Sequence, residues 1–447
     1  MSVTLEHLLQ LNQPIPRYTS YPTAPNWSAF SECEYRHALE SVEGPLSLYV
    51  HIPFCRTMCL YCGCSVVLNR RPENEARYVE YLLREIQLIA ALSASKKVTE
   101  IHFGGGTPTQ LSEMQLKAII DQIRDCFEVD HTADISIEID PRTVGEGTKL
   151  KFLQELGCNR VSFGVQDTDP KVQEAVRRRQ SYEMTRDTYL LARKLQFQSI
   201  NMDLIYGLPY QSVQTFRDTA EKIIEMKPDR IALFSYAKVP WLKPHQKAID
   251  EATLPSTQEK FEIYLLARTL FCQAGYRQIG MDHFALEKDP LAEAYHAKTL
   301  HRNFQGYTTF RAEHMIGFGI TSIGSVAGSF VQNVKELEQY YQAIDERRLP
   351  VHRGKTVSQE DRVRQWVILQ IMCQFRIDKR LFFERFYLSF DVHFDEEKKA
   401  ALALAELVED SADFFTVTSL GELFVRNVAA CFDAYLQKGT TQFSKAV

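Results

Sequence analysis

Three cysteines near the start of the chain have a spacing that suits an iron–sulfur cluster. Cys55, Cys59 and Cys62 lie in the run HIPFCRTMCLYCGC, with three and then two residues between successive thiols. Such a run gives three thiolates to one metal centre and withholds a fourth ligand, which leaves one iron open to a reacting molecule. A zinc knuckle would need a second cysteine pair at a matching distance, and Cys64 is the only nearby candidate. We therefore predict a reactive cluster at this loop.

Cys64 lies two residues beyond the last predicted ligand, and two roles are open to it. Its thiol could point toward the site and assist proton or electron handling, which makes it a candidate catalytic residue. It could equally be a buried thiol, the commoner fate of a free cysteine. We favour a role near the site.

Six short strands are predicted to position these groups. They span residues 46–54, 98–103, 134–139, 160–166, 199–206 and 230–236 and are rich in apolar residues, as strands covered on both faces are. Helical segments lie between them or follow the last one, with predicted N-caps at Ser112, Ser212 and Ser256. This alternation predicts an α/β fold with a parallel sheet, in the form of a partial, six-stranded (β/α)6 TIM-like barrel.

Polar and glycine-rich positions gather at the carboxyl ends of these strands, where parallel barrels place their active sites. The cysteine loop follows the first strand and Gly104 to Gly106 end the second. Glu138, Gln166 and Ala237 stand at the ends of the third, fourth and sixth strands, and Asp203 lies within the fifth. Glycines after a strand let the backbone approach a ligand closely, although a glycine run is more often a simple turn.

Three regions are predicted along the chain. Residues 1–44 form an N-terminal arm that contains the extended stretch RYTSYPTAPNW, and residues 45–355 form the catalytic domain. Within the latter, residues 280–309 show little helical periodicity and are interpreted as a loop. Residues 356–447 form a mostly helical C-terminal domain with an N-cap at Ser358, a strand in FFTVT and a helix over residues 420–435.

Composition indicates a cytoplasmic protein. The 447 residues carry a net charge of −5, which gives no overall footprint for nucleic acid, so an anionic substrate needs a local basic patch. Six of the ten cysteines are scattered, which favours buried thiols over a disulfide framework and indicates a reducing compartment. We find neither a signal peptide nor an apolar stretch long enough to span a membrane.

Several motifs, spread in order over nearly the whole chain, resemble those of a known protein family. They are PRYTSYPTA, LYVHIPFCRTMCLYCGC, HFGGGTPT, ISIEIDPR, FGVQD, NMDLIYGLP, GMDHFA and LHRNFQGYTT. The cysteine spacing alone resembles the radical S-adenosylmethionine superfamily, and the flanking motifs narrow the match. The chain resembles the bacterial oxygen-independent coproporphyrinogen III oxidases, also called coproporphyrinogen dehydrogenases. This resemblance implies an oxidoreductase of heme biosynthesis that converts two propionates of coproporphyrinogen III to vinyl groups, giving protoporphyrinogen IX and carbon dioxide.

The resemblance also implies the cofactors and partners. A [4Fe-4S] cluster would donate an electron to S-adenosylmethionine, and the resulting 5'-deoxyadenosyl radical would remove a substrate hydrogen. Two S-adenosylmethionine molecules, a low-potential electron donor such as flavodoxin or ferredoxin, and a monomeric protein are implied as well. No nucleic acid and no membrane are expected as partners.

The residues that match the family's cofactor sites fall into two sets. Positions matching the cluster-bound cofactor are Tyr49, Gly105, Glu138 and Ile323, and those matching the second cofactor are Tyr61, Gly106, Thr107, Gln166, Arg178, Asp203 and Ala237. Tyr61 stands where a phenylalanine is expected, and stacking should survive that change. Without the family match, we would interpret Asp203 as a strand residue bonded to nearby backbone. We would interpret Arg178 as part of a solvated helix face.

Substrate carboxylates need cations, for which the candidates are Arg17 in the arm and His283, His301 and Arg302 in the late segment. Such residues in irregular segments are more often surface residues. Two other functions stay open: a heme-binding or heme-delivering relative of the same fold, and a radical enzyme acting on another tetrapyrrole. Heme-delivering relatives resemble the barrel but lack the RYTSYPTA arm and the C-G-C extension, both of which are present here.

Overall fold

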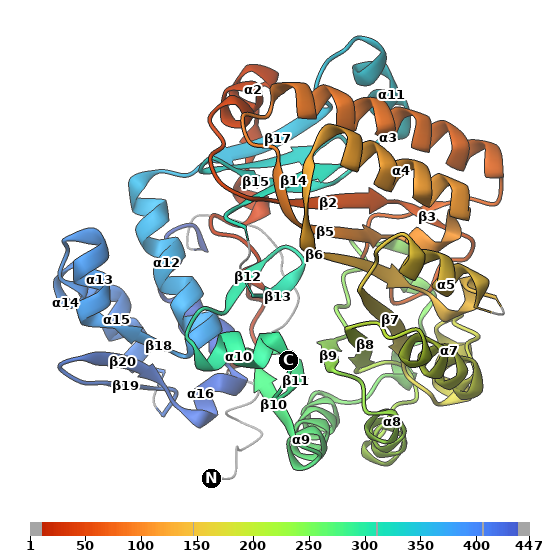
Figure 1. The fold of residues 1–447 in the computed structure, drawn as a ribbon. Coiled ribbons are helices and arrows are strands. Elements are labelled where there is room, and N and C mark those ends of the chain that lie inside the picture. Colours follow the sequence, from red (N-terminus) through yellow and green to blue (C-terminus); the bar gives the residue numbers. More distant parts are fainter. Residues whose placement is uncertain (1–10, 146, 310–311, 405, 437–447) are drawn as a thin grey trace.

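One sheet of thirteen strands organises the protein in a computed structural model that describes residues 11–145, 147–309, 312–404 and 406–436 (Figure 1). From edge to edge the strands are β1 (Ser28–Ala29), β17 (Val351–Thr356), β16 (Ser329–Asn333), β15 (Ile323–Val326), β14 (His314–Phe318), β2 (Leu46–Ile52), β5 (Lys97–Gly105), β6 (Glu128–Ile139), β7 (Arg160–Gln166), β8 (Ser199–Tyr206), β9 (Arg230–Ser235), β11 (His283–Leu286) and β10 (Tyr276–Ile279).

The centre of the sheet, from β14 through β9, is parallel, and antiparallel strands extend it at both edges. All six predicted strands lie in this parallel block as β2, β5, β6, β7, β8 and β9. β14 joins the block beside β2, with Ile316 opposite Leu48, so the parallel strands outnumber the six that were predicted. The fold is therefore α/β with a central, mostly parallel sheet.

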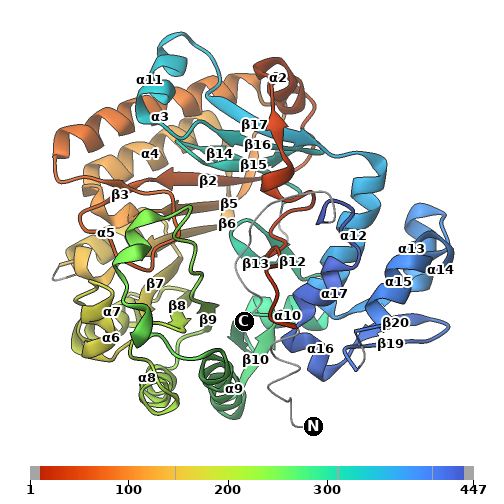
Figure 2. The same cartoon turned by 180° about the vertical axis from the view of Figure 1, so that it is seen from behind.

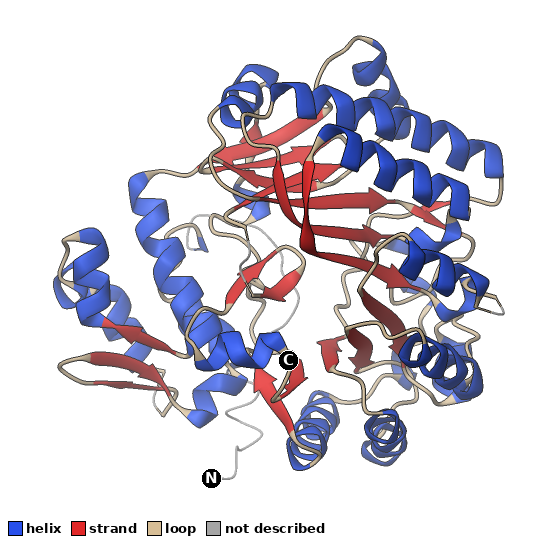
Figure 3. Ribbon diagram, in the orientation of Figure 1, coloured by secondary structure: helices blue, strands red, loops and turns tan. Residues whose placement is uncertain are grey.

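Helices cover the outer face of the curved sheet (Figures 1 and 3). Those along the parallel strands are α3 (Pro72–Leu92), α4 (Glu113–Cys126), α5 (Thr148–Glu155), α6 (Pro170–Ala175), α7 (Tyr182–Lys194), α8 (Val213–Met226) and α9 (Thr257–Gln273). The predicted N-caps are confirmed, because the Ser112, Ser212 and Ser256 hydroxyls accept from the backbone N–H three residues later. Each helix therefore begins where local chemistry places its first turn.

The two faces of the parallel sheet differ in polarity. Residues that point toward the helices are apolar and buried, for example Phe103, Ile137 and Leu204. The alternate residues, such as Glu138 and Asp203, are polar and only partly buried. One face of these strands therefore builds the core, and the other lines a polar interior.

The N-terminal arm packs between the C-terminal helices and the sheet edge (Figure 2). The Tyr18 hydroxyl donates to Asp433 at 3.1 Å, and the Ala434 N–H donates to the Tyr21 hydroxyl at 3.0 Å. Apart from the short turn η1 (Ala24–Asn26), RYTSYPTAPNW is free of helix, as predicted. An unpredicted helix, α2 (Glu32–Glu40), follows it behind a capping box at Ser31.

Residues 280–309 are not the irregular loop that we predicted. They contain β11, α10 (Pro290–His296) and the hairpin of β12 (His301–Asn303) and β13 (Gly306–Thr308). The Asp289 side chain caps α10 and Pro290 begins it, a local start signal that the sequence does contain. Elements of three to seven residues are too short to establish a periodicity, which explains the error.

The C-terminal part begins with α12 (Gln359–Gln374) behind the predicted cap at Ser358. It continues through α13 (Lys379–Phe386), α14 (Phe390–His393), α15 (Asp395–Leu402) and a small sheet of β18 (Arg376–Asp378), β20 (Phe414–Val417) and β19 (Val408–Asp410). FFTVT forms β20, and the predicted final helix is two helices, α16 (Ser419–Leu423) and α17 (Val425–Ala430). α11 (Leu337–Asp345) packs beside α3. Within the described residues, no helix combines the length and apolarity that a membrane crossing needs.

Candidate active site

The cysteine loop begins at β3 (Phe54–Cys55), which pairs with β4 (Val67–Leu68) just beyond the carboxyl end of β2. The Cys55 sulfur lies 3.3 Å from the Thr107 hydroxyl. The buried Cys59 thiol faces two cations, with Arg178 at 3.7 Å and Arg142 at 3.8 Å. The two guanidinium groups place positive charge beside this sulfur, and cysteine binds a metal as the thiolate.

The loop suits an iron–sulfur cluster by the chemistry of its donors. Cys55, Cys59 and Cys62 are free thiols, and the charges of Cys59 and Cys62 act on Cys55, so the three are neighbours in space. In the described part of the chain, no three His, Cys, Asp or Glu side chains are close enough to hold a single metal ion. A four-iron cluster spreads its thiolates more widely, because each binds a different iron.

A segment that sequence reasoning missed holds the cysteine loop from the other side. After β9, the Gln246 amide donates to the carbonyl oxygens of Tyr61 at 3.0 Å and Ala237 at 3.1 Å. His245 lies 2.9 Å from the Cys62 carbonyl oxygen, and Lys243 donates to that of Cys64 at 2.7 Å. This segment carries η4 (Pro244–Ala248), and nothing in the local sequence connects it to residues about 180 positions earlier.

His51 is a neutral, buried imidazole behind the glycine run. Burial lowers its pKa to about 4. Its Nδ1 lies 2.9 Å from the Tyr49 hydroxyl, and its Nε2 lies 3.1 Å from the Ser65 carbonyl oxygen. Because a carbonyl only accepts, Nε2 carries the proton and Nδ1 accepts from Tyr49. These bonds fix the Tyr49 ring, which also stacks on His102 at a centroid distance of 6.0 Å.

Neighbouring residues leave no room for a side chain in the glycine run. Gly105 has φ +116°, and a Cβ there would lie 2.6 Å from the His51 ring; at Gly106 it would lie 2.7 Å from the Pro53 carbonyl oxygen. The Gly105 N–H donates to Glu138 at 3.1 Å. Burial would raise the pKa of Glu138, but its contacts with His102 and this N–H lower it, so Glu138 is a carboxylate at neutral pH.

Asp203 lies farther along the same polar face, on β8. The Asn201 amide donates to it at 2.7 Å and the Ser162 hydroxyl at 3.2 Å. Burial and the negative charge of Glu138 raise the pKa of Asp203 to about 6. The interpretation of Asp203 as a strand residue bonded to nearby backbone is wrong, because both of these partners are side chains.

Arg178 is buried, so the interpretation as a solvated helix face is wrong as well. Besides Cys59 it contacts the Tyr61 hydroxyl at 3.3 Å, the Asp140 carboxylate at 3.5 Å and the Gly164 carbonyl oxygen. Burial alone would lower its pKa, but Tyr61, Asp140 and Cys59 raise it. Arg178 thus ties the cysteine loop to β7.

Comparisons with known proteins decide the family. The sequence pattern of the Radical SAM superfamily matches residues 49–223. The oxygen-independent coproporphyrinogen III oxidase of Helicobacter pylori is 41% identical over 100% of both chains, and that of Escherichia coli is 40% identical over 97% of this chain and 96% of its own. The chain belongs to the oxygen-independent coproporphyrinogen III oxidase family.

The solved structures agree with this family assignment. The structure of the coproporphyrinogen III oxidase from Escherichia coli, described as a radical SAM enzyme, matches with a TM-score of 0.91. It shares 40% identity, and the match covers 95% of this chain and 100% of that one. The fold described above is therefore the fold of this family.

The family-matched positions can now be located. Tyr49, Gly105 and Glu138 are mutual neighbours. Ile323, on β15, packs instead with the cluster of Trp27, Phe330 and Val357. Of the second set, Tyr61 lies in the cysteine loop and contacts Arg178, and Thr107, next to Gly106, contacts Cys55. The Ala237 carbonyl oxygen accepts from Gln246, which also bonds to that loop. Gln166 ends β7 with φ +72°. Gly164, two residues before Gln166, pairs with Asp203 on β8.

The basic candidates for substrate binding divide between two pockets. The first is lined by Arg17, Asp282 and Arg426, with Arg302 3.8 Å from Asp282. Burial would raise the pKa of Asp282, but Arg302 and the neighbouring His283, at 2.7 Å, lower it well below its ordinary value. Sequence reasoning missed Arg426, on α17, whose pKa burial and the charge of Arg17 lower to about 9.

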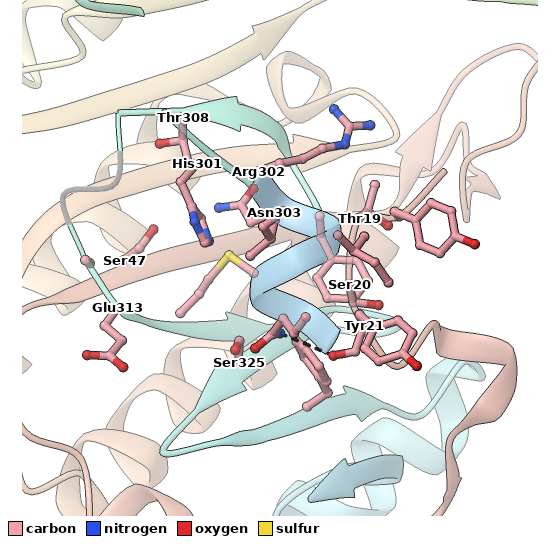
Figure 4. A pocket seen from close by; sticks show the side chains of 18 of the residues that line it. Thr19, Ser20, Tyr21, Ser47, His301, Arg302, Asn303, Thr308, Glu313 and Ser325 are labelled. Carbon is pink, nitrogen blue, oxygen red and sulfur yellow. Dashed lines mark hydrogen bonds between the residues drawn. The ribbon is translucent and has the colours of Figure 1, made fainter. Parts of the chain in front are cut away.

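The second pocket lies between the arm, the β12–β13 hairpin, the sheet and α12 (Figure 4). The hairpin contributes His301 and Arg302 to its lining, and the arm contributes Ser20 and Tyr21 (Figure 4). Burial lowers the pKa of His301 to about 4, so this imidazole is neutral at pH 7. Arg302 is 5% exposed, and its Nε has no hydrogen-bond partner. The cation candidates are therefore interior residues, not the surface residues that such segments usually carry.

Proposed function

We propose that this chain catalyses the oxygen-independent oxidative decarboxylation of coproporphyrinogen III to protoporphyrinogen IX in heme biosynthesis. The observation that carries the proposal is the end-to-end match to oxygen-independent coproporphyrinogen III oxidases, from the arm to the C-terminal helices. In this reaction two propionate side chains become vinyl groups, and each loses carbon dioxide.

Cys55, Cys59 and Cys62 would hold the cluster, with Arg142 and Arg178 beside Cys59. When bound, a [4Fe-4S] cluster together with S-adenosylmethionine supplies a 5'-deoxyadenosyl radical able to remove a hydrogen from an unactivated carbon. Glu138, as a carboxylate, suits an ammonium or a ribose hydroxyl. Asp203 suits the same groups above about pH 6. The protein thus binds, orients and excludes water.

We propose two S-adenosylmethionine sites, divided as the family match divides the residues. The first comprises Tyr49, Gly105, Glu138 and Ile323; the second comprises Tyr61, Gly106, Thr107, Gln166, Arg178, Asp203 and Ala237. Support comes from the contacts that join most members of each set. Asp203→Asn should leave the iron content intact and lower the stoichiometry of bound S-adenosylmethionine from two to one. Equal stoichiometry in the variant and the wild type would contradict the second site.

The arm and the interior arginines would hold the substrate's carboxylates. Arg17, Arg302 and Arg426 surround one carboxylate, Asp282, so this region carries excess positive charge. Among the described residues, Arg17 makes one hydrogen bond, at 3.5 Å to the Ser235 carbonyl oxygen, and its buried Nε has no hydrogen-bond partner. His283, beside Asp282, and the neutral His301, in the second pocket, would line the rest of the substrate site. Within the chain, residues 1–44 act as a covering arm, 45–355 as the catalytic domain and 356–447 as the C-terminal cover.

Anaerobic incubation of the cluster-loaded protein with coproporphyrinogen III, S-adenosylmethionine and a reductant tests the activity. We expect protoporphyrin fluorescence after air oxidation and two molecules of carbon dioxide per substrate. Cys59→Ala is the inactive control. Cofactor cleavage without carbon dioxide would favour heme delivery or another tetrapyrrole substrate instead.

The substrate contacts are tested by Arg17→Met, compared with Arg380→Met on exposed α13. Because a hydrogen bond to a charged group contributes about 1.5–3 kcal/mol, the KM for coproporphyrinogen should rise about tenfold or more with Arg17→Met only. An unchanged KM would remove Arg17 from the substrate site. We further propose a cytoplasmic monomer that receives electrons from flavodoxin or ferredoxin. The free thiols of all ten cysteines support a reducing compartment.

A further inference from the structure

Two segments around the cysteine loop carry positive charge and no acid. Residues 55–71 contain Arg56, Arg70 and Arg71 without an Asp or Glu. Residues 237–249 contain Lys238, Lys243 and Lys247, also without an Asp or Glu. The chain as a whole has a net charge of −5, so these segments differ in sign from the molecule that carries them. Such a local reversal indicates an electrostatic role.

The second segment packs directly on the cysteine loop of the first. Lys243, His245 and Gln246 contact the backbone carbonyl oxygens of the cysteine loop at 2.7, 2.9 and 3.0 Å. Figure 2 shows the segment after β9, in bright green, passing from the side of α8 toward β3. Lys238 pairs with Glu251 at 2.6 Å, which neutralises one of the six cations. Lys247 is exposed, as are Arg56, Arg70 and Arg71.

Two large apolar side chains stand out from the same segment. Trp241 is 48% exposed and Leu242 is 65% exposed, directly before Lys243. An exposed aromatic residue and a leucine beside exposed or partly exposed lysines have the composition of a protein interface, in which a few apolar anchors supply binding energy and charges set the rate and the partner. The bound molecule must carry negative charge and some apolar surface.

We propose that Trp241, Leu242 and the cations Lys243 and Lys247, here called the basic docking surface, bind a small acidic protein that carries one electron at a time. This inference rests on the proposed function, because only a cluster in the adjacent loop requires such a partner. One electron leaves the carrier, which is oxidised, and enters the cluster, which is reduced; no bond is made or broken. Contacts of electron-transfer proteins are small and transient, which suits an anchor of two side chains.

The position of the surface favours a protein over the tetrapyrrole substrate. The segment contacts the carbonyl oxygens of Cys62 and Cys64, so a carrier seated on it lies next to the cysteine loop. The cations proposed for substrate carboxylates, Arg17 and Arg302, line separate pockets in which no residue of the docking surface takes part among the described residues.

The test compares two reductants on the cluster-loaded enzyme. The variants are Leu242→Ser and Lys247→Glu, singly and together, since these side chains have no role in holding the loop. The matched controls are Met114→Ser, which is 70% exposed on α4, and Lys288→Glu, which is exposed beside α10. Stopped-flow loss of cluster absorbance reports the second-order rate of reduction by reduced flavodoxin, and the same signal is followed with dithionite.

We expect the rate with flavodoxin to fall roughly tenfold or more in the double variant and to lose most of its dependence on ionic strength. The controls and all dithionite rates should match the wild type. Unchanged flavodoxin rates would overturn the proposal, as would an equal loss with dithionite, which would mean that the segment maintains the loop. A rise in the KM for coproporphyrinogen would assign the surface to substrate attraction instead.

Failure of the docking surface and failure of the proposed function give different results. Dithionite-driven formation of protoporphyrinogen tests the function without any carrier protein. A protein that forms product with dithionite but shows equal flavodoxin rates in all variants retains the function and loses the docking surface. If flavodoxin reduces the variants more slowly than the wild type, as expected, but no product forms, the docking surface is supported and the proposed function is not.

Discussion

Gly105→Ala should destabilise the protein far more than an alanine substitution at another glycine with positive φ. Gly105 has φ +116°, and a Cβ there would lie 2.6 Å from the His51 ring. That ring has no room to retreat, because it is buried, bonded to the Tyr49 hydroxyl and to the Ser65 carbonyl oxygen, and lies 3.3 Å from the Thr321 hydroxyl. The added methyl group must therefore displace the backbone or break these bonds.

The magnitude follows from two contributions. A side chain held at positive φ costs about 1–2 kcal/mol. Displacing His51 loses two hydrogen bonds, each worth about 0.5–1.5 kcal/mol. The sum is about 2–5 kcal/mol. At Gly145 φ is +57° and nothing lies within 4 Å of the added Cβ, so Gly145→Ala carries the first contribution alone. Both substitutions gain equally from the stiffer unfolded chain, so this gain cancels in the comparison.

Urea unfolding of the cluster-free protein, followed by tryptophan fluorescence, measures the difference. Gly105→Ala should lose about 1–3 kcal/mol more than Gly145→Ala. In the cluster-loaded protein it should also weaken S-adenosylmethionine binding, because the Gly105 N–H holds the Glu138 carboxylate. Equal losses at Gly105 and Gly145 would refute the reasoning, since they would mean that His51 moves at no cost.

Three further predictions follow from single contacts. Cys59→Ala should remove iron from the anaerobic protein and Cys64→Ala should keep it; an iron assay with the opposite result would reverse the ligand assignment. Burial and the charge of Glu138 raise the pKa of Asp203 to about 6, so its stabilising contribution is complete below about pH 4 and is lost as the pH rises through about 6. Asp203→Asn should flatten the fall in unfolding free energy over this interval, and an unchanged slope would show that Asp203 titrates as in the unfolded chain. Ser112→Ala removes the capping box of α4 and should cost about 1 kcal/mol in urea unfolding, whereas a loss near zero would show that the cap is not limiting.

Local sequence signals were sufficient to predict the six parallel strands and the starts of several helices. Ser112, Ser212 and Ser358 mark helix starts because a hydroxyl bonds to an N–H three residues later, which needs nothing beyond one turn of chain. The six strands were predictable because each is a short apolar run whose signal also lies within a few residues of the chain. The alternation of apolar and polar residues in β6 and β8 also indicates that one face of these strands is polar.

Elements without enough residues to establish a period were not predictable in the same way. β14, α10, β12 and β13 are each only three to seven residues long, and their form depends on the strands and helices they pack against. Their presence changes the site, because His301 and Arg302 of the β12–β13 hairpin line a pocket together with residues of the arm. Propensity alone could assign these residues only to a loop.

The sequence by itself predicted the cysteine ligand set and determined the parallel strands and the family, because spacing, periodicity and identity are properties of the linear chain. Tertiary structure alone decided what surrounds those cysteines. Arg178 stands 119 residues from Cys59, and His245 stands 183 residues from Cys62. Arg426 reaches the backbone of the arm 410 residues away. Burial and charge depend on such distant neighbours, and only the folded chain brings them within a few ångströms of the site.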